Sequence, residues 1–340
     1  MSDTEIASQR LGRVDQRVLA DARRRLERYD LTTQTEDFVL EAQLLASRLS
    51  EPLRRSLLTF RRFGHPSGGT LIRGVPLGPL PSTPRRVDVT SNTARSVGAT
   101  MSVLVAQLGD QYGFKPEFGG AIIQDMTPVR GFETQQISLG STVNLKTHVE
   151  MAFSPFRSDY VALLCIRQDH DRQAGTTLSA IEAILPLLDR ATVDVLRQPR
   201  FRTKVDASFL IGGGHTKDIW MDPICVFEDG TRRPRLRVDF AETEGTDVMA
   251  QTALETLHKA AVRAQRVVRL EAGDLLIVDN GRALHGRTPF VPRYDGKDRW
   301  LLRSFITKDL RRSECVRPAD GRTVSPDYDM LACDNVYVQV

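Results

Sequence analysis

From Gly119 onward the sequence consists of short apolar segments separated by turn-forming residues. The segments that fit β-strands span residues 121–124, 159–166, 224–227, 236–238, 274–279 and 300–307. One longer segment, residues 248–265, has the spacing of an amphipathic helix. Many short strands with few helices between them are typical of a double-sheet jelly roll. We therefore predict a mainly β protein with flanking helices and a jelly-roll core.

The N-terminal region has a helical pattern instead. Phe38, Ala42 and Leu45 recur on one face of a helix, and a similar stripe follows Pro52, which suits a first helical turn. Such stripes usually pack against the rest of a protein. We predict a single domain that spans residues 1–340. Its jelly-roll core is expected over residues 119–313 with a helical insert at 248–265, and a helical N-terminal extension, residues 1–65, is expected to pack on that core.

Composition and charge argue against several classes of protein. Of 340 residues, 41% are hydrophobic, and 47 basic against 43 acidic residues give a net charge of +4. The basic residues are spread out and not interleaved with aromatic ones, so nucleic-acid binding is not expected. No apolar run suits a membrane span and no charged-then-apolar leader is present. The four cysteines lack Cys-x-x-Cys spacing, which argues against a zinc site or disulfide framework and favours a cytoplasmic protein.

His148 and Glu150 are two residues apart, on a β-strand or at its end. Because side chains in a strand alternate with a period of two, both project to the same side and can bind one ion together. His285, in the distant segment 279–287, can supply a third ligand. Two histidines and one carboxylate on one face form the facial triad of non-haem Fe(II) oxygenases, which leaves positions open for a cosubstrate and O₂. A His-x-Glu pair alone is more often a surface pair, so the prediction needs further support.

Two arginines provide that support. In residues 298–306, alternation places Arg299, Leu301, Arg303 and Phe305 on one face of a half-buried strand. Arginines that point into an apolar barrel are unfavourable unless anions meet them. The segment therefore predicts a site that binds anionic groups.

The residues around these positions resemble a known family. Residues 148–155, the His285-Gly286-Arg287 block and residues 292–300 are similar to the clavaminate synthase-like Fe(II)/2-oxoglutarate-dependent oxygenases, over about residues 119–313. Within that family they look most like the hydroxylases of free amino acids, the arginine and asparagine β-hydroxylases of peptide-antibiotic pathways. The resemblance implies a double-stranded β-helix core of the cupin-like kind, Fe(II) as the metal, and 2-oxoglutarate and O₂ as cosubstrates.

The resemblance also implies roles for individual residues. It implies that His148, Glu150 and His285 are the iron ligands. It also implies that Arg299, assisted by Thr176, binds the distal carboxylate of 2-oxoglutarate. The positions expected to contact the substrate are Arg303 at its α-carboxylate, Glu150, Asp239, Glu117 and Ser138. Asp279 is expected to support His285, because a metal-bound imidazole usually donates its other N–H to an oxygen.

The side chain of the substrate is predicted less narrowly. In arginine-hydroxylating relatives an Asp-x-Asp pair grips the guanidinium, whereas here Asp239 keeps the first position and Ala241 stands at the second. One carboxylate can still pair with an ammonium, a guanidinium or an amide. We therefore predict C3 hydroxylation of a free basic or polar L-amino acid, with arginine or a cyclic arginine derivative first, and lysine and asparagine after. Asp239 could instead form a strand-end ion pair with Arg235 or Arg237.

Several alternatives stay open at this point. The carboxylate of Glu150 favours hydroxylation, since halogenating relatives carry a small residue there, but desaturation is a further possible outcome. The same chemistry could act on an amino acid tethered to a carrier protein. A metal-free binding protein on a jelly-roll scaffold is the remaining alternative. A small-molecule amino acid is the expected partner, and the sequence does not decide whether a carrier protein or a homodimer is involved.

Overall fold

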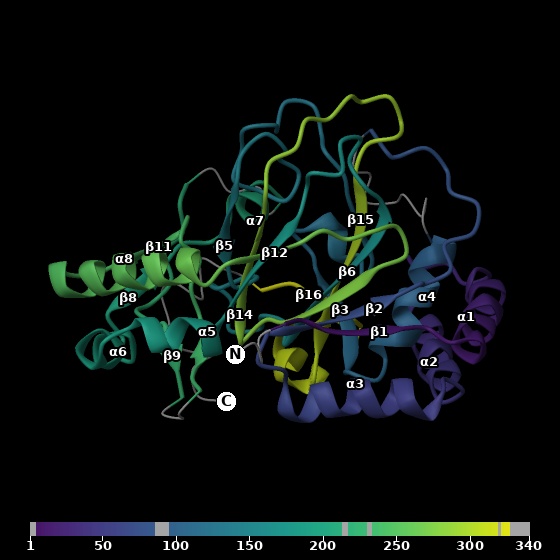
Figure 1. The fold of residues 1–340 in the computed structure, drawn as a ribbon, viewed down its shortest axis with the longest axis horizontal. Helices are drawn as coiled ribbons and strands as arrows, with labels where there is room; N and C mark the ends of the chain where they lie inside the picture. Colours follow the sequence, from purple (N-terminus) through teal and green to yellow (C-terminus); the bar gives the residue numbers. More distant parts are fainter. Residues whose placement is uncertain (1–4, 86–94, 213–216, 230–232, 319–320, 327–340) are drawn as a thin grey trace.

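The computed structural model describes residues 5–85, 95–212, 217–229, 233–318 and 321–326. Two β-sheets form the centre of the molecule (Figure 1). The larger sheet has the order β1-β2-β13-β6-β15-β3-β16, and β4 also pairs with β15. Its strands are β1 (Ala7–Arg10), β2 (Gly69–Arg73), β3 (Asp110–Phe114), β4 (Gln124–Met126), β6 (Tyr160–Arg167), β13 (Leu275–Asp279), β15 (Trp300–Thr307) and β16 (Thr323–Val324).

The smaller sheet has the order β12-β7-β14-β5, and all its pairs are antiparallel. Its strands are β5 (Leu145–His148), β7 (Thr176–Ala180), β12 (Arg266–Val268) and β14 (Ala283–Arg287). Leu178 and Ala283 of this sheet share one buried cluster with Leu163 and Phe305 of the larger sheet. The two sheets therefore enclose a common core, and the predicted jelly roll is confirmed.

The strand β15 separates two environments. All eight of its residues are buried. Trp300, Leu302 and Ile306 on one face pack into a cluster with the N-terminal helices, whereas Leu301 and Phe305 on the other face belong to the core between the sheets. The period of two therefore directs Arg303 to the inside, as predicted.

The N-terminal helices lie against the outer face of the larger sheet, at the right and bottom in Figure 1. They are α1 (Arg13–Leu26), α2 (Thr35–Ala46), α3 (Glu51–Phe63) and α4 (Arg95–Val105). Phe38, Leu45, Leu53 and Leu57 are buried in the same cluster as Trp300. The stripes identified in the sequence are therefore packing surfaces.

A second group of elements covers the smaller sheet, at the left in Figure 1. It contains α5 (Ile181–Ile184), α6 (Arg190–Leu196), α8 (Val248–Arg263) and the strand pairs β8 (Phe201–Thr203) with β11 (Thr243–Gly245) and β9 (Phe227–Glu228) with β10 (Arg235–Leu236). The short helix α7 (Ala207–Gly212) packs instead into the core between the two sheets, where Phe209 contacts Phe114 of β3. The predicted helix 248–265 is α8. Its N-cap residue is Asp247, whose side chain accepts a hydrogen bond from the backbone N–H of Ala250. Short 3-10 helices lie at Phe118–Gly120, Leu185–Leu187 and Leu310–Val316.

Some predicted strands are wrong. Residues 121–124 follow a 3-10 helix, and the strand there begins only at Gln124. Residues 224–227 and 236–238 overlap only the two-residue strands β9 and β10, which pair with each other, and the backbones of Val238 and Asp239 contact the end of β5. Within the described part of the chain no helix is long and apolar enough to cross a membrane. Cys165, Cys225 and Cys315 are free, and Cys333 lies outside the described residues.

Candidate metal centre

His148, Glu150 and His285 meet across two paired strands. His148 on β5 is the register partner of His285 on β14. The centroids of their rings lie 4.5 Å apart, and Nε2 of His285 lies 3.3 Å from Oε2 of Glu150. One ligand atom from each of the three side chains lies within 4.8 Å of the other two. Strand pairing therefore gathers residues that are far apart in the sequence.

The donor atoms of this cluster suit a divalent transition metal. Burial opposes ionisation of Glu150, but Arg303 and the two histidines outweigh it and lower the pKa of Glu150 to about 2. Burial and the neighbouring His148 lower the pKa of His285, which favours its neutral form. Nδ1 of His285 is buried without a hydrogen-bond partner among the described residues. The ionised carboxylate of Glu150 and the neutral imidazole of His285 are donors of the kind that a non-haem Fe(II) site requires.

A second group with possible metal ligands has a simpler explanation. His170, Asp295 and Asp298 also bring ligand atoms within 4.8 Å of one another. Asp298 accepts the backbone N–H of Arg293, and Asp295 accepts the backbone N–H of Lys297. These contacts stabilise a loop, and His170 joins it to a second loop through its 3.2 Å contact with Asp295.

A cavity of about 70 Å³ lies beside the triad, and the predicted cosubstrate residues Arg299 and Thr176 line it. Burial lowers the pKa of Arg299, although Cys165 and Asp169 oppose this. No described carboxylate lies within ion-pair distance of Arg299; the ring of Phe290 lies 5.6 Å from its guanidinium carbon. Arg287 lines the same cavity. Arg287 is buried and Arg299 is partly buried, and two guanidinium groups in one cavity favour an anionic ligand.

Arg303, predicted to bind the α-carboxylate of the substrate, contacts acidic side chains in this structure. Its Nη1 lies 3.1 Å from Oε1 of Glu150, its Nη2 lies 2.5 Å from Oε1 of Glu117, and its Nε donates to Gln124. Burial raises the pKa of Glu117, although the charge of Arg303 opposes this rise. Oε2 of Glu117 is buried and has no hydrogen-bond partner among the described residues. Both charge types that an amino-acid head group needs are therefore adjacent.

An adjoining cavity of about 60 Å³ contains the predicted residues Ser138 and Asp239 together with Asp206, which the sequence did not single out. The backbone of Asp239 bridges to His148, and its carboxylate accepts the N–H of Ala241. Burial raises the pKa of Asp239, and burial followed by the charge of Asp239 raises the pKa of Asp206 well above its ordinary value. Asp206 precedes α7, a segment distant from Asp239 in sequence, so no local pattern could have identified it.

The hydrogen bond expected between Asp279 and the imidazole of His285 is not formed. Its carboxylate accepts the backbone N–H of Gly281, and Nδ1 of His285 has no partner among the described residues. Burial raises the pKa of Asp279, while the charges of Lys308 and Arg235 oppose the rise. Asp279 therefore stabilises the turn before β14 without touching the imidazole.

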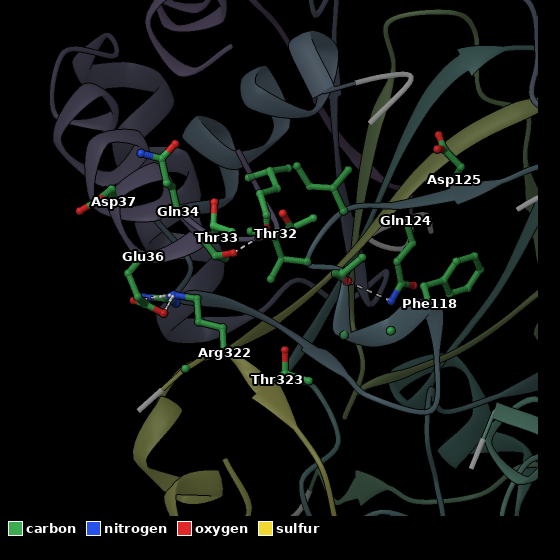
Figure 2. Close-up of a pocket in the computed structure, with 18 residues that line it drawn as sticks. Thr32, Thr33, Gln34, Glu36, Asp37, Phe118, Gln124, Asp125, Arg322 and Thr323 are labelled. Carbon is green, nitrogen blue, oxygen red and sulfur yellow. Dashed lines mark hydrogen bonds and ion pairs between the residues drawn. The ribbon is translucent and has the colours of Figure 1, made fainter. Parts of the chain in front are cut away.

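A larger cavity, about 500 Å³, lies away from the triad (Figure 2). Residues 31–37, 118–125 and 321–323 line it, and Glu36 and Arg322 form an ion pair of 2.9 Å at its edge. None of the three candidate metal ligands lines it. Gln124, which also accepts from Arg303, separates this cavity from the candidate site. We therefore assign the chemistry to the two smaller cavities beside the triad.

The comparisons with known proteins agree with this geometry. Residues 30–305 match the model of the family described as taurine catabolism dioxygenase TauD, TfdA family. The chain is 43% identical to the L-asparagine oxygenase of Streptomyces coelicolor, over 79% of this chain and 80% of that protein. It is 36% identical to the L-lysine 3-hydroxylase of Catenulispora acidiphila, over 86% of this chain and 82% of that protein.

A solved structure extends the likeness to the fold. The non-heme iron oxygenase OrfP, in complex with Fe, succinate and (3S)-hydroxy-L-Arg, superposes with a TM-score of 0.82 at 29% identity, over 93% of this chain and 99% of that chain. These comparisons confirm the expected kinship with oxygenases that hydroxylate free amino acids. The chain therefore belongs to the taurine catabolism dioxygenase TauD, TfdA family and is an Fe(II)- and 2-oxoglutarate-dependent oxygenase.

Proposed function

We propose that this protein hydroxylates an unactivated C–H bond, at C3, of a free basic L-amino acid, with arginine or an arginine derivative as the first candidate. One observation carries the choice of side chain. Asp206 and Asp239 share the cavity beside Glu150, and neither forms an ion pair with a described residue. A basic side chain supplies the missing cation, and hydrogen bonds to charged partners are among the stronger ones in proteins.

In this proposal His148, Glu150 and His285 hold Fe(II). Bound Fe(II) supplies the oxidative chemistry, in which 2-oxoglutarate and O₂ are consumed, succinate and CO₂ are released, and the substrate gains one oxygen atom. The protein itself places the reactants. A metal held by three protein ligands would keep further coordination positions for 2-oxoglutarate and O₂.

Arg299 binds the distal carboxylate of 2-oxoglutarate, and Thr176 donates its hydroxyl to the same group. The planar guanidinium can form two parallel hydrogen bonds to a carboxylate, which fixes the direction as well as the position of the ligand. The absence of an ion pair at Arg299 among the described residues supports this role, because an anion stabilises a guanidinium that is partly removed from water. Its cavity includes His285, so the 2-oxo acid group would lie close to the metal.

Arg303 and Ser138 bind the α-carboxylate of the substrate, and the carboxylates of Glu117 and Glu150 accept its ammonium group. Arg303 already lies between these two carboxylates, 2.5 and 3.1 Å away. A zwitterionic head group matches this arrangement, since it adds one positive and one negative charge and leaves the net charge unchanged. Positioning of this kind orients one C–H bond toward the metal.

The far end of the substrate lies against Asp206 and Asp239. Burial raises the pKa of both carboxylates, and the charge of Asp239 raises the pKa of Asp206 further through like-charge repulsion. A guanidinium or ammonium group placed between them removes this repulsion, and a neutral amide does so less effectively. We therefore place arginine and lysine before asparagine.

The test is a panel of the twenty amino acids with Fe(II) and 2-oxoglutarate. Succinate release and a gain of 16 Da are scored by mass spectrometry for each substrate. We expect kcat/KM to be highest for arginine, next highest for lysine and lower for asparagine, with the other neutral amino acids inactive. Turnover confined to neutral or acidic amino acids would contradict the proposal.

Asparagine is a second candidate, and the 43% identity to an L-asparagine oxygenase favours it. A single carboxylate at Asp239 could accept the amide N–H₂ of asparagine. The same panel separates the two candidates by their kcat/KM values. A loss of 2 Da in place of the gain of 16 Da would indicate desaturation.

We further propose that the substrate is free in solution and that the protein acts in the cytoplasm. The free thiols of Cys165, Cys225 and Cys315 suit a reducing compartment. Turnover of the free amino acid at least equal to that of the same amino acid on a carrier protein supports the first part. A strong preference for the carrier-bound form would overturn it.

A further inference from the structure

Asn280 lies in the turn between β13 and β14 and is 1% exposed. Its side-chain Oδ1 accepts the backbone N–H of Glu150 at 2.8 Å, and its Nδ2 donates to the backbone carbonyl of Glu150 at 3.1 Å. Nδ2 also donates to the carbonyl of Ser158 at 2.9 Å. One amide side chain therefore satisfies both backbone groups of Glu150.

Glu150 needs such a partner because the strand before it has already ended. β5 stops at His148, and the next residue, Val149, is held by a hydrogen bond from its N–H to the carbonyl of Val238. Glu150 then enters a turn, so no neighbouring strand pairs with its backbone. A buried backbone amide without a partner is strongly unfavourable, and the amide of Asn280 takes the place of the missing strand.

The residue after Glu150 increases this need. Met151 has a φ of 56°, in the left-handed region, and it is 1% exposed. Residues other than glycine adopt this conformation only when the surrounding structure holds them in it. The contacts of Asn280 immediately before Met151 help to hold the turn in this conformation.

We propose that Asn280 is a positioning residue that fixes Glu150 relative to His285, an inference that rests on the proposed metal-binding role of these two residues. The turn that carries Asn280 leads directly into β14, which carries His285. Asn280 therefore joins the backbone of one candidate ligand to the strand of another. A rotation of the Glu150 backbone would move its carboxylate away from both Nε2 of His285 and Arg303, which now lie at 3.3 and 3.1 Å.

Two substitutions test this role by different means. Asn280→Ala removes both contacts to Glu150. Asn280→Asp keeps the volume and the acceptor for the Glu150 N–H, but it replaces the donor with an oxygen that faces the carbonyls of Glu150 and Ser158. The matched control is Ser179→Ala on β7, which removes a buried hydrogen bond to the carbonyl of Ala261 next to β14 without touching a candidate ligand.

The first measurement is Co(II) binding to the purified full-length protein, followed by its visible absorption bands, alongside the thermal midpoint of unfolding. We expect both Asn280 variants to bind Co(II) at least tenfold more weakly than the wild type, as replacement of residues that orient metal ligands commonly does. Ser179→Ala should lower the thermal midpoint and keep the wild-type Co(II) affinity. The second measurement is the ratio of hydroxylated amino acid to succinate, which should fall in the Asn280 variants.

The outcomes separate the two proposals. Folded Asn280→Ala or Asn280→Asp protein with wild-type Co(II) affinity and wild-type coupling would overturn the positioning role. If Asn280→Ala does not fold, Asn280→Asp, which preserves the side-chain volume, decides the matter by the same two readouts. A Glu150→Ala variant that binds Co(II) as tightly as the wild type would instead overturn the metal site itself.

Discussion

Arg299 is the single residue that most directly tests the cosubstrate site. Arg299→Lys keeps the charge and loses the planar fork, so we expect the KM for 2-oxoglutarate to rise about tenfold or more, in line with roughly 1.5–3 kcal/mol for a hydrogen bond to a charged group. Steady-state kinetics with varied 2-oxoglutarate measures the change, and Fe(II) content should stay at the wild-type level. An unchanged KM would assign the clamp to another arginine, and Arg287, which lines the same cavity, is the first to examine.

Asp206 is the residue that decides between a basic and a neutral substrate. Asp206→Asn preserves shape and removes one of the two aspartate carboxyl groups in the cavity, so we expect the KM for arginine to rise about tenfold or more while asparagine is affected less. Consumption of 2-oxoglutarate should continue with fewer hydroxylations per succinate. Asp194→Asn, at a half-exposed position on α6, serves as the control. Equal effects on arginine and asparagine would remove the main support for a basic substrate.

Residues of the site differ in how far sequence alone could predict them. The pairing of His148 with Glu150 was predicted from the period of two on a strand or at its end, and in the structure β5 ends at His148 while Glu150 lies in the turn that follows. The inward direction of Arg303 follows from the same period. Asp206 and Asn280 contribute through contacts between segments distant in sequence. In the turn before β14, the pattern could not tell whether Asp279 or Asn280 faces Glu150, because turn residues have no fixed alternation.

Among the elements, the pairing of β5 with β14 creates the site, and Arg287 at the end of β14 extends it. Its guanidinium donates to the carbonyls of Gly140 and Val143, in the segment that carries Ser138 over both cavities. Burial, reinforced by the charge of Arg299, lowers the pKa of Arg287 to about 9. These contacts hold the loop whose Ser138 lines the cosubstrate cavity.

Arg287→Gln should therefore loosen this loop. We expect faster hydrogen–deuterium exchange in residues 135–144, because the side chain can no longer hold both carbonyls. Arg202→Gln, which disrupts a half-exposed ion pair with Glu244, is the matched control and should leave that segment unchanged. Wild-type exchange in residues 135–144 of Arg287→Gln would show that the loop is held by other contacts.

Strand prediction succeeded for the strands with a continuous apolar run in the middle of the larger sheet and was less successful for the smaller sheet. Residues 159–166, 274–279 and 300–307 correspond closely to β6, β13 and β15, which form the middle of the larger sheet. The smaller sheet was harder to predict. Its strands β7 and β14 are rich in threonine, alanine and glycine and have no continuous apolar run, although every residue in them is buried.

For the whole molecule, the N-terminal helices and the larger sheet share one core. Phe38, Leu53, Trp300 and Ile306 are all buried in it, so the outer face of β15 is covered while its inner face carries Arg303. The helical stripes predicted these packing surfaces but not the sheet face that they cover, since that depends on contacts between distant segments. Burial at this junction also has an electrostatic cost, at Asp125.

Asp125 gives stability a pH dependence. The indole N–H of Trp300 donates to its Oδ1 at 2.7 Å, which lowers the pKa, but burial has the larger effect and raises it from 3.8 to about 6. Since the folded-state pKa lies above the unfolded value, folding favours the protonated carboxyl group. The free energy of unfolding therefore falls as the pH rises from about 4 to about 6 and Asp125 loses its proton. The difference corresponds to roughly 3 kcal/mol as an upper bound.

Asp125→Asn keeps an acceptor for the indole and removes the charge. We expect its free energy of unfolding to exceed that of the wild type by up to roughly 3 kcal/mol at pH 8, with the gain vanishing near pH 4, as measured by urea unfolding at several pH values. The half-exposed Asp194→Asn variant should show no such trend. A gain for Asp125→Asn that is the same at pH 4 and pH 8 would show that the buried carboxylate titrates normally, and that the junction between β4 and β15 tolerates its charge.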